Sequence, residues 1–98
     1  MNSLPSLHDA TLNDVVFEWS RGHVRLSVTI DVGVIGIIQA VDVTDLKCPR
    51  TQPWGPSSSI NSATAKTVVD GKHLAIEMQS GDLIEIRCRE ISFNSGAS

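Results

Sequence analysis

Hydrophobic and polar side chains alternate strictly along residues 22–31, GHVRLSVTID. The apolar positions on one face are Val24, Leu26, Val28 and Ile30. A period of two is typical of a strand buried on one side, whereas a helix would scatter these residues around its surface. The preceding segment, NDVVFEW, shows the same alternation. A two-residue turn at Arg21 and Gly22 would join the two segments as a hairpin. The predicted pairs are Trp19–Val24, Phe17–Leu26 and Val15–Val28.

Residues 34–43, VIGIIQAVDV, are apolar on both faces. This composition predicts a central strand covered on both sides, or a strand that meets a partner subunit. Its turn is expected at Val32 and Gly33, or in a longer loop there.

The second half of the chain predicts two further hairpins. Residues 59–69 lead into Asp70 and Gly71, a strong turn signal, although a short helix over 58–67 is the alternative. The pairs expected across this turn are Thr67–Leu74, Ala65–Ile76 and Ala63–Met78. A three-residue turn over 80–82 then joins residues 72–79 to residues 83–93. The pairs expected across it are Met78–Ile84, Ile76–Ile86, Leu74–Cys88 and the like-charged Glu77–Glu85.

These patterns predict one all-β domain spanning residues 1–98. About six antiparallel strands, connected mainly as a meander, would form a curled sheet, a small barrel or a sandwich. Residues 1–10 are expected to lead into the sheet, residues 44–57 to form a long loop rich in proline, and residues 94–98 to fray.

The net charge and composition limit the classes of partner that the protein could bind. The 98 residues include 8 basic and 11 acidic side chains, a net charge of −3. Nucleic acid and anionic membranes reward clustered Lys and Arg, so both are disfavoured. The first fifteen residues lack the basic start and apolar core of a signal peptide, and no apolar run approaches the ~20 residues of a membrane span. We therefore expect a cytoplasmic protein whose Cys48 and Cys88 are thiols.

The stretch CPRTQPWGPSSSIN, residues 48–61, is the most unusual in the chain. Loops this long in a compact domain tend to be functional. Trp54 either closes the core as a plug or anchors a partner from the surface. The binding candidates are His8, Asp9, Trp54 and Ser57.

Catalytic and metal chemistry have little support in the sequence. His8, His23 and His73 show no metal-ligand spacing, and Cys48 has no neighbouring base. GPSSSIN lacks the second glycine and lysine of a phosphate-binding loop. The paired carboxylates Glu77 and Glu85 are typical of a solvated sheet face. We expect no catalytic residue, no metal and no cofactor.

The segment SLHDATL, followed by the alternating strand that ends in Trp19, resembles the start of small bacterial domains, some grouped with immunity proteins of polymorphic toxin systems. PWGPSSSIN and IEMQSGDLIEI extend the resemblance over about half of the chain. It implies a small, β-rich, non-catalytic cytoplasmic protein, with binding and blocking of a toxin as one form of its function.

These features leave two hypotheses for the function. The first is a protein-binding or immunity-like module, or a homodimer that associates through residues 34–43. The alternative is a small-ligand binder or simple enzyme with a pocket near the loop 48–61.

Overall fold

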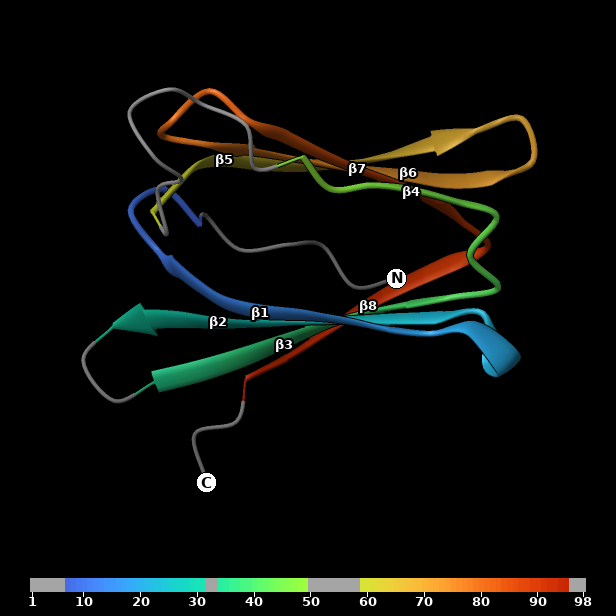
Figure 1. The fold of residues 1–98 in the computed structure, drawn as a ribbon, viewed down its shortest axis with the longest axis horizontal. Helices are drawn as coiled ribbons and strands as arrows, with labels where there is room; N and C mark the ends of the chain where they lie inside the picture. Colours follow the sequence, from blue (N-terminus) through green and yellow to red (C-terminus); the bar gives the residue numbers. More distant parts are fainter. Residues whose placement is uncertain (1–6, 32–33, 50–58, 96–98) are drawn as a thin grey trace.

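The computed structural model describes residues 7–31, 34–49 and 59–95, and the structural statements below concern these ranges. They form two four-stranded antiparallel sheets that lie face to face (Figure 1). The first sheet has the order β1-β2-β3-β8 and the second the order β4-β7-β6-β5. The elements are β1 (Thr11–Glu18), the 3-10 helix η1 (Trp19–Arg21), β2 (His23–Asp31), β3 (Val34–Val41), β4 (Asp45–Lys47), β5 (Ile60–Val68), β6 (Gly71–Met78), β7 (Leu83–Cys88) and β8 (Glu90–Ser95). The all-β antiparallel class is confirmed, in its two-sheet form.

Two segments bend and carry the chain from one sheet to the other. After β3, Asp42 adopts a left-handed φ of 53° and the chain continues into β4 of the second sheet. After β7, the chain passes Arg89 and returns to the first sheet as β8. Because β3 pairs with β8 and β4 pairs with β7, the bent segments stay side by side through the crossing. Strands that switch sheets by bending are a known way to form the corner of a sandwich.

These crossings account for the differences in strand number and boundaries. The predicted strand over 83–93 is divided into β7 and β8, and β4 is an additional strand, which gives eight strands in place of about six. The predicted loop 44–57 is wrong at its start, because β4 lies within it. The predicted fraying from residue 94 is also wrong at its start, because Asn94 and Ser95 pair with Ile37 and Gly36 in β3.

The three predicted hairpins form, but each register is shifted by two residues. The observed pairs include Phe17–Val24, Val15–Leu26, Ala65–Leu74, Ala63–Ile76, Leu74–Ile86 and Ile76–Ile84. Since side chains alternate with a period of two, such a shift leaves the apolar residues of the strands on their predicted faces. It also separates the predicted like-charge pair, because Glu85 lies opposite Ala75 and Glu77 opposite Leu83.

The turns explain the shift. The first hairpin closes through η1 and Gly22, whose φ is 64°, so Trp19 leaves the strand. In the second, the loop consists of Val69 and Asp70, and Gly71 already pairs with Val68. This hairpin also confirms the strand interpretation of residues 58–67 from Ile60 onward and excludes the helix there.

The third hairpin has the predicted three-residue loop, one position earlier than expected. Gly81 has a φ of 100° and its N–H donates to the carbonyl of Met78, while the N–H of Met78 donates to the carbonyl of Asp82. The strands therefore pair from Met78 and Asp82 outward. The predicted turn at Val32 and Gly33 lies outside the described residues.

The core lies between the two sheets. Its fully buried members come from β2, β3, β5, β6 and β7: Val24, Leu26, Val28, Ile38, Ala40, Ile60, Leu74, Ile76 and Ile86. Among the described residues the second sheet covers only one face of β3, so the expected cover on both faces is not found there, and the alternative of a partner subunit on the outer face stays a prediction. On the outer face Ile35 is 40% exposed, and Val16 of β1 is 39% exposed.

Candidate functional site

The end of the sandwich that carries the crossings also carries the first hairpin loop. The N–H of Val43 donates to the carbonyl of Gly22 (2.8 Å), which ties the crossing segment to the hairpin. The N–H of Thr44 donates to the carbonyl of Arg87 (2.9 Å), and the N–H of Arg89 donates to the carbonyl of Val41 (3.0 Å). Backbone hydrogen bonds therefore fix residues 43–46 relative to the hairpin end.

Two aromatic side chains stand exposed at this end. Because Gly22 closes η1 in a left-handed conformation, with its N–H donating to the carbonyl of Trp19, the strand stops before Trp19. Trp19 is 85% exposed and Phe17 38% exposed. Their rings pack edge to face, with centroids 5.8 Å apart and an interplanar angle of 64°. This arrangement holds the Trp19 indole in a defined position although solvent surrounds it.

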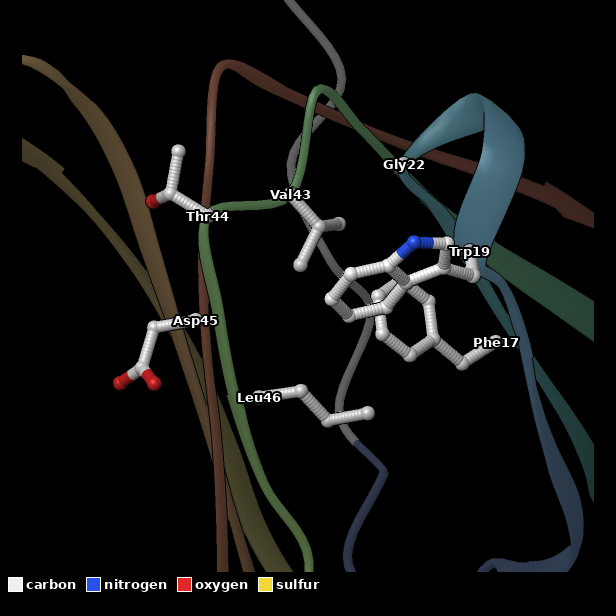
Figure 2. A pocket seen from close by; sticks show the side chains of 7 residues that line it. All are labelled: Phe17, Trp19, Gly22, Val43, Thr44, Asp45 and Leu46. Atoms are coloured by element: carbon white, nitrogen blue, oxygen red, sulfur yellow. The ribbon is translucent and has the colours of Figure 1, made fainter.

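The aromatic pair forms one wall of a pocket of about 450 Å³, which we call the Trp19 pocket. Its lining residues are Phe17, Trp19, Gly22, Val43, Thr44, Asp45 and Leu46. Figure 2 shows Val43 and Leu46 pointing toward the two rings, and Thr44 and Asp45 pointing away from them. The volume is within the range of ligand pockets, and the inward side chains are apolar. The pocket therefore suits an aromatic or aliphatic group.

Charged residues lie on β4, which contributes to the Trp19 pocket, and at the crossing before it. β4 carries Asp45 opposite Arg87 and Lys47 opposite Glu85, two opposite-charge pairs across the β4–β7 ladder. At the crossing itself, Nη1 of Arg89 lies 3.8 Å from Oδ2 of Asp42. Both partners of that last pair are largely exposed, so it stabilises the crossing only weakly.

Of the residues predicted to bind, His8 and Asp9 lie in a turn just before β1, near the start of β5. Nδ1 of His8 is 2.8 Å from the carbonyl oxygen of Asn61. Asp9 has a φ of 68°, which brings its carboxylate to 3.6 Å from Nε2 of His8 although the two residues are adjacent. The amide of Gln79 donates to Oδ1 of Asp9 at 2.6 Å. The N–H of Asp9 donates to the carbonyl of Ile60.

This turn therefore ties residues 7–10, which precede β1, to β5 of the second sheet. The N–H of Ile60 donates to the carbonyl of Ala10, and Thr11 forms a bridge with Ser59. Because the left-handed Asp9 turns the chain, the side chains of His8 and Asp9 approach each other. Trp54 and Ser57 lie outside the described residues.

The other candidate groups are dispersed. His73 is partly covered, and its Nε2 lies 3.2 Å from Oε1 of Glu85. Asp82 is buried in the β6–β7 turn, where Ser80 donates to its carboxylate at 3.0 Å. Over the described ranges, no three His, Cys, Asp or Glu side chains gather as metal ligands would.

The two cysteines differ in environment. Cys48 follows β4 and is exposed, whereas Cys88 ends β7 and is buried. Burial raises the pKa of the Cys88 thiol from 9.0 to about 11; the charge of Glu90 adds to the effect and that of Lys72 opposes it. Cys88 is consequently a protonated core residue at neutral pH.

The sequence prediction places the Trp19 side chain on the wrong side of the first sheet for this site. The predicted register places Trp19 on the inward face opposite Val24, whereas Phe17 takes that place and Trp19 stays outside. The predicted two-residue turn and the observed loop through η1 both end at Gly22, so the glycine in the sequence does not distinguish them. The Trp19 pocket also needs Val43 and Leu46, which only the crossing of β3 into β4 brings beside the aromatic pair.

Searches for similar proteins give no match to any family model, curated protein or solved structure. In the part of the chain that the structure describes, no helix has the length and apolar character to cross a membrane.

Proposed function

We propose that this chain is a non-catalytic protein-binding module whose contact site is centred on Trp19 and Phe17. The supporting observation is a tryptophan that is 85% exposed yet oriented by an aromatic neighbour beside an apolar pocket. Covering such a ring removes roughly 150–200 Å² from water, which corresponds to about 4 kcal/mol at 25 cal/mol/Å². Tryptophan is also the residue type most enriched among interface hot spots.

In the immunity-like form of this proposal the partner is a toxin domain, and binding itself is the activity because it blocks the toxin. The resemblance of SLHDATL and the following strand to immunity proteins supports this form. The protein would act in the cytoplasm, a compartment that suits the thiol state of its two cysteines.

The test uses the purified product of the reading frame encoded beside this one, with binding measured by calorimetry. Trp19→Ala should weaken binding by at least about 30-fold, the effect of losing a hot spot worth 2 kcal/mol. Val69→Ala is the matched control, because Val69 is 99% exposed but lies in the β5–β6 turn. Equal affinities for the two variants would refute the site.

Self-association is a second proposal, supported by the outer face of the first sheet. There Ile35 and Val16 are about two-fifths exposed, and Ile37 lines a hollow of about 410 Å³ together with Arg25 and Asp14. In a twofold dimer each surface meets its own copy, so Asp14 of one chain could meet Arg25 of the other. Sedimentation at tens of micromolar should show a dimer that Ile35→Lys dissociates. A strict monomer there would rule the dimer out.

A further inference from the structure

The Trp19 pocket borders the open side of an edge strand. Within the described residues, β4 pairs with β7 and has no strand on its other side. The pocket lining includes β4 residues Asp45 and Leu46. A strand at a sheet edge presents unpaired backbone N–H and C=O groups, which an extended peptide can satisfy by adding to the sheet.

The side chains of β4 show where those of an added strand would go. Leu46 points toward Phe17 and Trp19, and Asp45 points away (Figure 2). Lys47 shares the outward face with Asp45, since side chains alternate along a strand. A residue paired with Leu46 would therefore place its side chain over the pocket, and its two neighbours would lie beside the charged residues.

The charges of β4 define what those neighbours should be. Across the ladder to β7, Asp45 already lies opposite Arg87 and Lys47 opposite Glu85. Opposite charges paired directly across strands are favourable and like charges are unfavourable, by a few tenths to about 1 kcal/mol. On the side of β4 away from β7, the same rule favours a basic residue opposite Asp45 and an acidic residue opposite Lys47 in an added strand.

We propose that β4 binds an extended peptide segment as an additional antiparallel strand, with an aromatic side chain in the Trp19 pocket. In antiparallel order the segment reads acidic, aromatic, basic, because its first residue meets Lys47 and its third meets Asp45. The proposal rests on the binding function assigned above and adds the chemistry of the partner. Antiparallel pairing matches the rest of the sheet and is the more stable form.

The short length of β4 explains why the pocket is needed. Three residues provide only a few backbone hydrogen bonds, each with a net value of about 1 kcal/mol. The aromatic anchor supplies the remaining affinity, and the charges fix the direction and register of the added strand.

The experiment uses the capped peptide Thr-Thr-Glu-Phe-Lys-Thr-Thr as the probe, titrated into the isotope-labelled chain and followed by amide NMR shifts. The largest shifts should fall on residues 43–47. A peptide with Lys and Glu exchanged should bind several-fold more weakly, and Trp19→Ala should weaken binding at least 10-fold. The Val69→Ala variant should bind like the unchanged chain.

Backbone methylation of the probe tests strand pairing directly. One peptide is methylated at the Phe amide and another at the Glu and Lys amides, because alternate amides of a strand point to opposite sides. One of the two should lose binding at least 10-fold and the other should retain it. If both retain binding while Trp19→Ala abolishes it, strand addition is refuted and the binding function stands.

Two other outcomes also decide the matter. If the probe binds but Trp19→Ala changes nothing, both the pocket and the function assigned to it are refuted. If the probe does not bind and Trp19→Ala instead dissociates a dimer in sedimentation, the pocket receives a second copy of this chain, and the peptide proposal is overturned.

Discussion

Replacing Gly71 by alanine should be among the most destabilising single-methyl changes in this protein. Gly71 begins β6 with a φ of 146°, a conformation that is essentially restricted to glycine. A Cβ atom there would overlap the carbonyl oxygen of Cys88 and lie 3.2 Å from Cα of Arg89. Both neighbours are backbone of the adjacent segment, so the overlap can be relieved only by separating β6 from β7.

The expected cost has two parts, one from the backbone conformation and one from the overlap. A non-glycine residue in such a conformation costs on the order of 1–3 kcal/mol, and an overpacked site costs a further ~1–3 kcal/mol. We expect Gly71→Ala to lower the free energy of unfolding by about 3–5 kcal/mol. A domain of this size has roughly 5–15 kcal/mol in total, so the variant stays folded only if the wild type lies above the lower limit.

Two other glycines separate the two effects. Gly22 has a φ of 64°, but the nearest atom to an added Cβ is 3.6 Å away, so Gly22→Ala should cost only about 1 kcal/mol for the left-handed backbone. Gly36 has no such φ, but its Cβ would lie 2.6 Å from Cζ of Phe93. Because that ring can shift, Gly36→Ala should cost about 1–2 kcal/mol.

Urea unfolding followed by circular dichroism measures all three variants. With a slope of about 1.5 kcal/mol per molar urea, Gly71→Ala should lower the midpoint by about 2 M or more, and Gly22→Ala by about 0.7 M. Circular dichroism is the suitable probe because Trp19 is exposed in the folded state and reports burial poorly. A Gly71→Ala variant as stable as Gly22→Ala would refute the inference that β6 and β7 approach this closely at Gly71.

Other predictions concern the core, the thiols and the exposed tryptophan. Ile38→Ala should cost about 2–5 kcal/mol in urea unfolding, and Ile35→Ala, on the exposed face of the same strand, less than about 1 kcal/mol in the monomer. At pH 8 an alkylating reagent should modify Cys48 and spare Cys88 until the chain is unfolded, so modification of both in the folded chain contradicts the burial of Cys88. Since burial raises the pKa of Cys88 from 9.0 to about 11, its contribution to stability is complete below pH 9 and is lost as the pH rises through about 11. Cys88→Ala should remove that part of the pH dependence, which urea midpoints at several pH values would show. Trp19→Ala should change the thermal midpoint by the equivalent of less than about 1 kcal/mol, because Trp19 is 85% exposed and its ring contact with Phe17 is a single edge-to-face pair.

The sequence predicts which face each strand buries much better than which residues pair. Val24, Leu26 and Val28 are fully buried, as their alternation predicts. Their partners are all displaced, because the apolar pattern repeats every two residues and is satisfied equally by registers two residues apart. Only the turn distinguishes such registers. At Gly22, Gly71 and Gly81 the glycine lies at the end of the loop or just beyond it, so the sequence marks the turn region without fixing the loop.

The crossings could not be predicted from the apolar pattern for a related reason. The apolar segment 34–43 continues past Asp42 to Val43, and no proline or glycine lies beside Asp42 to mark the bend. Asp42 supplies the left-handed conformation, which Asp and Asn tolerate better than most residues, but such a residue also occurs in ordinary turns. At Arg89 the sequence gives no signal of a change of sheet. The prediction of about six strands follows from taking 83–93 as one strand and 44–57 as a loop without a strand.

The same crossings explain why the proposed contact site lies at this end of the sandwich. Because β3 leaves the first sheet at Asp42, β4 is the edge of the second sheet among the described residues, and the side of β4 away from β7 faces the hairpin end of the first sheet. The register shift places Trp19 outside the strand at that same end. If the predicted register held, Trp19 would lie opposite Val24 on the inward face. Two positions thus produce the whole site. The end of β1 leaves the aromatic pair exposed, and the bend after β3 supplies the apolar wall of Val43 and Leu46 and places β4 beside it.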